Sequence, residues 1–158
     1  MTRPRRLLAA AVLPAVLALG MSSCAATVSL QPADNADDPA CAAVSVRLPD
    51  TVAGQDRRWT DAQATGAWGS PAAVILTCGV EEPGPSTLRC ETVEGVDWLI
   101  DESEGADNRY RFTTFGRTPA VEVYLDFDVV GSADTLRALS PILNPILEKT
   151  GSVCTPRA

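Results

Sequence analysis

The sequence predicts an α+β fold in which a small antiparallel sheet of about four to five strands packs against an N-terminal helix and a kinked C-terminal helix. Three observations predict it. Short β-branched apolar runs occupy the middle of the chain, a hairpin pattern surrounds residues 116–119, and apolar residues at helical spacing occur near the end. Residues 39–158 contain no internal repeat and no low-complexity segment, so we expect one domain there.

The first helix is expected to begin at Pro39. Asp38 is a favoured N-cap, and proline suits the first helical position because its missing N–H is not needed there. Cys41, Val44 and Leu48 then share one face, and a proline at position 49 ends the helix. Residues 50–69 are irregular in pattern and predict no regular element.

The strands are expected from residue 72 onward. The run AAVILTCGV after Pro71 is short and β-branched, which is typical of a buried strand. Residues 88–93 and 96–100 continue one another or pair, and residues 109–130 form the clearest hairpin. Apolar and polar residues alternate along its second strand from Val121 to Asp128, so one face of the sheet is predicted to be exposed to solvent.

The last helix is predicted from Ser132, which can serve as its cap. Leu136, Leu139 and Leu143 follow at helical spacing. Because Pro141 removes a backbone donor inside this pattern, we expect the helix to be kinked or broken and to end at residue 151.

The N-terminus has the pattern of a secretory signal. Arginines at positions 3, 5 and 6 precede the apolar run 7–20, whose fourteen residues fall short of the about 20 that cross a bilayer. The run ends in Met21-Ser22-Ser23-Cys24, which resembles the lipobox of bacterial lipoproteins, where cleavage precedes a cysteine that carries diacylglycerol. We therefore expect residues 1–23 to be a lipoprotein signal peptide and Cys24 to be acylated. The alternative is a disulfide cysteine behind a conventional signal.

The cleaved protein is expected on the outer face of the cytoplasmic membrane, at its extracellular side. Two acyl chains anchor a protein stably. Residues 24–38 would form the acylated cysteine and a flexible tether that holds the domain on the order of 20 Å from the bilayer. Whether export is general secretory or twin-arginine stays open.

The charge of the cleaved chain restricts its partners. Three of the 13 basic residues precede Cys24, which leaves ten against 20 acidic residues, a net charge of −10. This balance argues against nucleic acid and against electrostatic adhesion to anionic lipid. The membrane is therefore expected to be a partner through the lipid anchor.

Four cysteines remain after the anchor: Cys41, Cys78, Cys90 and Cys154. An even number in an exported chain predicts two disulfides. Zinc would need close cysteine pairs or histidines, but the nearest pair is twelve residues apart and the chain has no histidine. The acidic run 34–38 lacks the glycine and glutamate of an EF-hand. We expect no metal and no cofactor.

Four residues are candidates for binding or chemistry. Trp68, Trp98 and Arg117 could line a cleft for an anionic or sugar-bearing envelope molecule. The competing interpretation is that both tryptophans are core and the arginine is a solvated turn residue. Asp97 could be the acid or base of an envelope hydrolase, but such an enzyme needs a second carboxylate across a groove. Without histidine there is no Ser-His-Asp triad.

Several phrases occur together in one order: Cys41 with Leu48-Pro49, residues 67–71 (AWGSP), 78–80 (CGV), 95–98 (GVDW) and 112–123 (FTTFGRTPAVEV). Over about residues 39–147 they resemble the actinobacterial lipoproteins of domain-of-unknown-function family 3515. The resemblance implies an anchored envelope protein without an assigned activity, so no catalytic residue is carried over. We expect a non-enzymatic accessory or binding module that engages an envelope protein or a cell-wall component, with an envelope hydrolase as the alternative.

The cysteine pairing has three possibilities, of which two have arguments. A tight hairpin centred on Gly84 would join Cys78 to Cys90 and leave Cys41 for Cys154. Against it, the loop 83–85 is wide, and the phrases that carry the resemblance include Cys41 and Cys78. These considerations favour Cys41–Cys78 and Cys90–Cys154.

Overall fold

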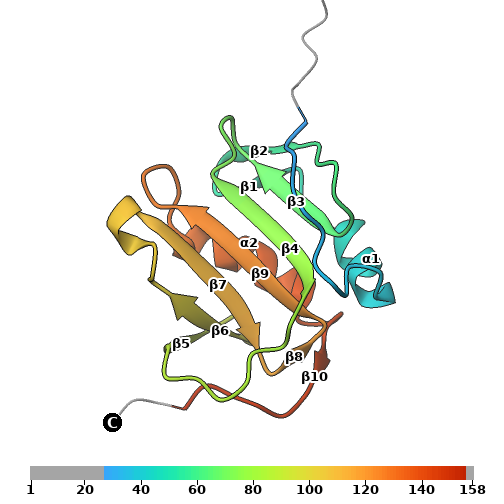
Figure 1. Ribbon diagram of the computed structural model, residues 1–158, viewed down its shortest axis with the longest axis vertical. Coiled ribbons are helices and arrows are strands. Elements are labelled where there is room, and N and C mark those ends of the chain that lie inside the picture. The colour runs from blue at the N-terminus through green and yellow to red at the C-terminus, as the bar shows by residue number, and fades with distance from the viewer. Residues whose placement is uncertain (1–26, 156–158) are drawn as a thin grey trace, which may run out of the picture.

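The structure is a computed structural model that describes residues 27–155. Its main element is an antiparallel sheet with the strand order β1-β2-β3-β4-β9-β7-β6-β5 (Figure 1). These strands are β1 (Thr51–Val52), β2 (Gln55–Arg58), β3 (Thr65–Trp68), β4 (Val74–Val80), β5 (Arg89–Val93), β6 (Val96–Asp101), β7 (Arg109–Phe115) and β9 (Ala120–Asp126). A second, two-stranded sheet pairs β8 (Arg117–Thr118) with β10 (Glu148–Lys149). The helices are α1 (Pro39–Ser45), α2 (Ser132–Leu143) and the short 3-10 helix η1 (Gly105–Asp107).

The prediction of a sheet of four to five strands is wrong, because the main sheet has eight strands and the fold is mostly sheet. The five strands expected from the sequence are present as β4, β5, β6, β7 and β9. The other three come from residues 51–68, where the sequence shows no alternation of apolar and polar residues. The strand β2 reads Gln-Asp-Arg-Arg, and all four residues of β3 are buried. Neither pattern has the period of a half-buried strand.

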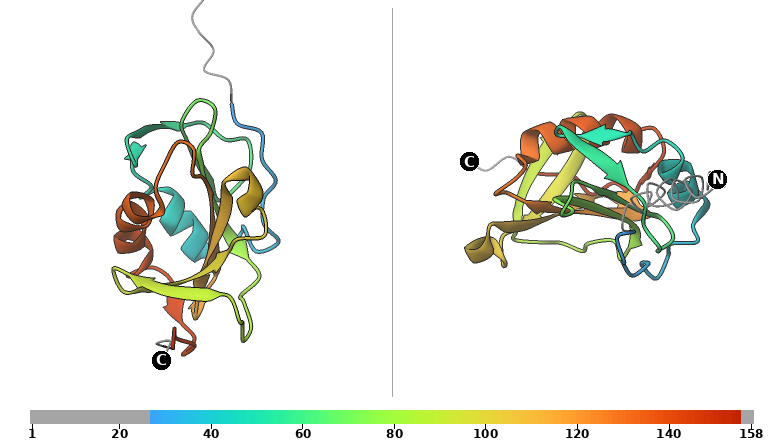
Figure 2. Two further views of the ribbon diagram at one scale, coloured as in Figure 1. Left: turned by 90° about the vertical axis from the view of Figure 1, so that its left-hand side faces the viewer. Right: turned by 90° about the horizontal axis from the view of Figure 1, so that it is seen from above.

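Both helices cover the same face of the main sheet (Figure 2, right). On this face, buried leucines of α2 and buried valines of β9 join Phe112 and both buried tryptophans in one core. Burying each such aliphatic side chain stabilises the fold by about 1.5–3 kcal/mol. The opposite face, which Figure 1 turns toward the viewer, carries half-buried polar side chains.

The start of α1 agrees with expectation, whereas both ends of α2 differ from it. The carboxylate of Asp38 caps α1 as predicted, accepting a hydrogen bond from Ala40 N at 2.7 Å. The cap of α2 is Gly131 rather than Ser132, and the helix runs through Pro141 and ends at Leu143. Pro141 is exposed, as is Arg137 one turn earlier, so water can solvate the carbonyl that the proline leaves without a donor.

The N-terminal segment is docked where a flexible tether was expected. Val28 forms a parallel bridge with Thr60, and the amide of Asn35 donates to Gly79 O at 3.1 Å. Ala36 is buried in the core. Of the expected tether 24–38, the part from residue 28 onward therefore packs on the domain, and Cys24 itself lies outside the described residues.

The two disulfides are Cys41–Cys78 and Cys90–Cys154, the pairing favoured above. The first joins α1 to β4, and both of its cysteines are fully buried. The second joins β5 to the C-terminal segment. The alternative Cys78–Cys90 pairing fails because three strands, β9, β7 and β6, separate β4 from β5 in the sheet.

Candidate functional site

The tryptophans of the predicted cleft are core residues. Trp68 and Trp98 are each 0% exposed, and each indole N–H has an internal acceptor. Trp68 donates to Pro49 O at 2.9 Å, and Trp98 donates to the hydroxyl of Ser140 at 3.1 Å. A ligand cannot stack on either ring, so the prediction of an accessible cleft lined by these residues is wrong. The competing interpretation, that both tryptophans pack in the core, is correct.

Arg117 is buried as well, with 4% of its surface exposed. One guanidinium nitrogen donates to Asn144 O and Leu147 O, each at 3.2 Å. The other donates to Gly95 O at 2.6 Å and to Asn144 Oδ1 at 2.7 Å. Burial lowers the pKa of Arg117, and the nearby carboxylate of Asp97 partly opposes that shift. The side chain thus joins the turn before β6 to the chain after α2 and is neither solvated nor open to a ligand.

Asp97 is the one candidate near Arg117 that contacts solvent. Its two carboxylate oxygens accept hydrogen bonds from Thr92 Oγ1 at 2.5 Å and from Cys154 N at 2.8 Å. It lies beside Arg117 and Lys149 in a hollow of about 120 Å³ whose other lining residues carry no carboxylate. The hollow therefore lacks the second acid that glycoside hydrolysis needs.

The open face of the main sheet holds a polar cluster that sequence analysis did not single out. Strand register places Asp101, Arg111, Tyr124 and Ile75 in one row across β6, β7, β9 and β4. These side chains lie on the face that the helices leave uncovered. The alternation along residues 121–128 predicted a wet face, but it did not indicate which residues of other strands share it.

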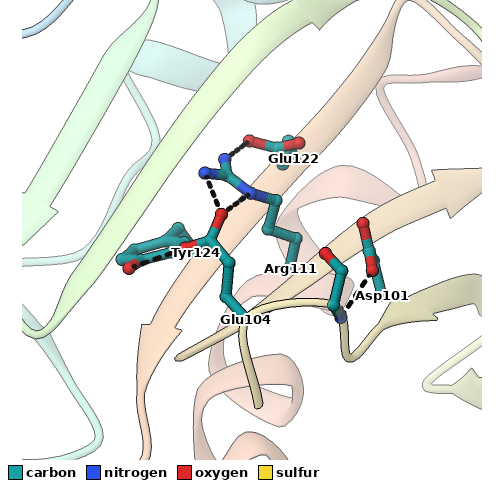
Figure 3. A network of polar contacts seen from close by, with 6 residues as sticks. Asp101, Glu104, Arg111, Glu122 and Tyr124 are labelled. Atoms are coloured by element: carbon teal, nitrogen blue, oxygen red, sulfur yellow. Dashed lines mark hydrogen bonds and ion pairs between the residues drawn. The ribbon is translucent and has the colours of Figure 1, made fainter. Parts of the chain in front are cut away.

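Arg111 is the centre of this cluster (Figure 3). Its guanidinium pairs with Glu122 at 3.0 Å and with Glu104 at 3.0 Å, and it lies 4.9 Å from the centroid of the Tyr124 ring. The phenol of Tyr124 donates to the second oxygen of Glu104 at 3.4 Å. Glu104 reaches the strands because it stands at the N-terminal end of η1. The four residues, named here the Arg111 cluster, are therefore held in fixed positions.

The protonation states of the cluster follow from its surroundings. Burial disfavours the charged guanidinium, but the hydrogen bonds and charges of Glu104 and Glu122 outweigh it and raise the pKa of Arg111. Burial raises the pKa of Tyr124, and the negative charge of Glu104 adds to that effect. At neutral pH the cluster therefore presents a guanidinium and a protonated phenol.

A hollow of about 340 Å³ adjoins the Arg111 cluster. It is lined by the loop residues Pro83, Pro85 and Leu88 and by Arg111 and Glu122 of the cluster. Apolar walls with a few fixed polar groups are typical of binding sites. Both carboxylates are held by one guanidinium, so the polar groups beside the hollow are fixed in position.

The described residues contain neither a metal-binding cluster nor a membrane-spanning helix. No three metal-ligating side chains gather in residues 27–155. Over the same range, no helix has both the length and the apolar character needed to cross a membrane.

A family model described as "Protein of unknown function (DUF3515)" matches residues 6–150. The chain belongs to this family. No curated protein and no solved structure shows a significant similarity to it. Since the description of the family assigns no activity, the function has to be argued from the surface of this chain.

Proposed function

We propose that the protein is a membrane-anchored extracytoplasmic lipoprotein that acts as a non-enzymatic binding module of the cell envelope. Its lipid is carried by Cys24, and its binding surface is the open face around the Arg111 cluster. The partner is a component of the envelope, either a protein or a cell-wall polymer.

The disulfides support the location and the anchor. Disulfides persist in oxidising compartments outside the cytoplasm. All four cysteines between residues 27 and 155 are paired with one another, so the fifth cysteine of the sequence, Cys24, has no cysteine of this chain left as a partner. A free thiol directly after Ser22-Ser23 is what lipid attachment requires.

The observation that carries the binding role is the Arg111 cluster itself. Its ion pairs lie on an uncovered sheet face, and they are joined to an aromatic ring and a hollow. The pair with Glu104 is exposed, and such ion pairs stabilise a fold little, typically by 0 to about 1 kcal/mol. The cluster therefore contributes more to recognition than to folding. No contact of Asp97 favours the hydrolase alternative.

The test is crosslinking from two faces in intact cells that express the full-length protein. A photo-reactive amino acid replaces Thr113, a half-buried residue that lines the hollow, or Arg137, an exposed residue of α2 on the opposite face. We expect a specific adduct from position 113 that is lost when Arg111→Ala is added. Digestion of the adduct with protease or with wall hydrolases identifies its class.

Two results would contradict the proposal. Equal adducts from positions 113 and 137 would refute an open-face binding surface, as would an adduct unchanged by Arg111→Ala. For the anchor, Cys24→Ser should release the protein from membranes, and tight association of that variant after salt washing would refute lipid anchoring at this residue.

A further inference from the structure

Trp59 is a tryptophan that the fold leaves outside its core. It is 80% exposed, whereas Trp68 and Trp98 are fully buried. It follows β2 directly and stands beside a hollow of about 600 Å³, which Ser45, Asp50 and Thr65 also line. A single exposed apolar side chain is ordinary on a protein surface, so what Trp59 can do depends on what lies next to it.

The N-terminal segment is fixed to the backbone of Trp59. The amide of Val28 donates to Trp59 O at 2.8 Å, and the amide of Asp61 donates back to Val28 O at 3.3 Å. One residue pair further on, the amide of Leu30 donates to the Asp61 carboxylate at 2.8 Å. The described chain therefore begins beside the backbone of Trp59.

The chain between this attachment and the expected anchor is short. Val28 is four residues after Cys24. A fully extended chain covers at most 3.3–3.6 Å per residue, so the two residues are at most about 14 Å apart. The polar interface of one bilayer leaflet is roughly 5–8 Å thick. With lipid on Cys24, Trp59 is therefore within reach of the membrane surface whatever path the connecting residues take.

We propose that Trp59 inserts into the interface of the membrane and thereby orients the domain, an inference that rests on lipid attachment at Cys24. Indole rings favour the boundary between headgroups and acyl chains because they combine an apolar ring with one N–H donor. Arg57 and Arg58 line the hollow together with Asp50, and Asp61 follows Trp59 by two residues, so the formal charges near Trp59 cancel and attraction to anionic lipid is not the driving force. Docking is then expected on neutral and anionic bilayers alike.

This orientation leaves the open face accessible. The segment that begins at residue 27 lies at the top of Figure 1, and the open face is turned to the viewer. A membrane at the top would run edge-on to the sheet. The Arg111 cluster would then face sideways along the membrane, where a partner anchored in the same envelope can approach it.

The experiment measures fluorescence quenching of the indole by lipid. The mature chain from Cys24 onward is coupled through this thiol to a maleimide phospholipid in phosphatidylcholine vesicles with or without brominated acyl chains. The other cysteines are in disulfides, and within the described residues 27–155 the hydrophobic core begins at Ala36. Artificial coupling makes the result independent of whether cells acylate Cys24, which mass spectrometry of the protein from membranes tests separately.

The expected result is that brominated lipid quenches the exposed-tryptophan signal at least two-fold and that Trp59→Phe abolishes this quenching. The matched control is the double variant Trp59→Phe, Val153→Trp. Val153 is 65% exposed and belongs to the segment after β10, which Figure 1 shows at the other end of the molecule from β2, so an indole there should escape lipid quenching. Equal quenching at positions 59 and 153 would overturn the proposal. Access of aqueous iodide to Trp59 that is unchanged by coupling would overturn it too.

Discussion

Replacement of Arg117 by alanine is the sharpest test of the structure, because the residue looks like a solvated turn residue in the sequence and is buried in the fold. Its guanidinium supplies the donors for three backbone carbonyls and one side-chain oxygen. Alanine removes all four hydrogen bonds and leaves a space that its methyl group cannot fill. The carbonyls of Gly95 and Leu147 then lose the guanidinium as a donor.

The expected loss is large compared with the stability of a domain. A buried acceptor left without a donor costs about 1–3 kcal/mol, and hydrogen bonds to charged groups lie at the upper end. The four bonds share one side chain and are not additive, so we expect Arg117→Ala to lower the free energy of unfolding by about 3–5 kcal/mol. For a domain of this size that corresponds to a fall in Tm of about 10–20 °C.

The assay is reversible urea and thermal unfolding followed by circular dichroism. Arg137→Ala is the matched control, because Arg137 is exposed on α2 and pairs only with Asp134 three residues away. It should change stability by less than about 0.5 kcal/mol. Arg117→Lys keeps the charge but loses the planar fork, so an intermediate loss is expected. A loss below about 1 kcal/mol for Arg117→Ala would refute the structural role.

Two further predictions concern the ends of the chain. Mild reductant should open Cys90–Cys154 before Cys41–Cys78, because the first pair is partly accessible and the second is fully buried. Alkylation followed by peptide mass analysis measures the order of opening. Opening of Cys41–Cys78 first would contradict the prediction. Hydrogen bonds from Leu30 N and the Ser29 side chain lower the pKa of Asp61 below its ordinary value of 3.8. The ionised Asp61 carboxylate therefore stabilises the docked segment, and this contribution is complete at pH values above the ordinary pKa. It is lost as the pH falls through the lowered pKa. The amide chemical shift of Leu30 should therefore move at acid pH in the wild type. It should not titrate in Asp61→Asn, because the amide oxygen there can still accept the hydrogen bond but carries no titratable group. A pH profile shared by both proteins would contradict this.

The sequence predicted the elements whose burial is periodic and missed those whose burial is not. The hairpin of β7 and β9 was found because Val121, Val123 and Leu125 alternate with polar residues and are fully buried. The strand β3 was missed because Gly66 and Ala67 carry small side chains and every residue of the strand is enclosed. A Cβ atom at Gly66 would stand 2.7 Å from Leu48 Cδ1, so close packing rather than alternation determines that strand.

The Arg111 cluster could not be predicted residue by residue. Its members come from the loop before β7, from β7 itself and from β9, and only the register of the folded sheet places Arg111 opposite Tyr124. The alternation predicted that Glu122 and Tyr124 face solvent, which is correct. The contribution of Glu104 depends on the turn at η1, whose sequence carries no periodic signal.

The residues that drew attention in the sequence are informative for a different reason from the one expected. Trp68, Trp98 and Arg117 lie within the phrases that resemble the family, and all three are buried with their polar atoms hydrogen-bonded inside the protein. A large side chain beside glycine or in a hairpin turn therefore marks, in this fold, a place where the chain is tied to a distant segment. Binding has to be sought where side chains are held but uncovered, at the Arg111 cluster, and where an indole is left without packing, at Trp59. These two surfaces can be tested independently, because one lies on the open sheet face and the other beside the start of the docked segment.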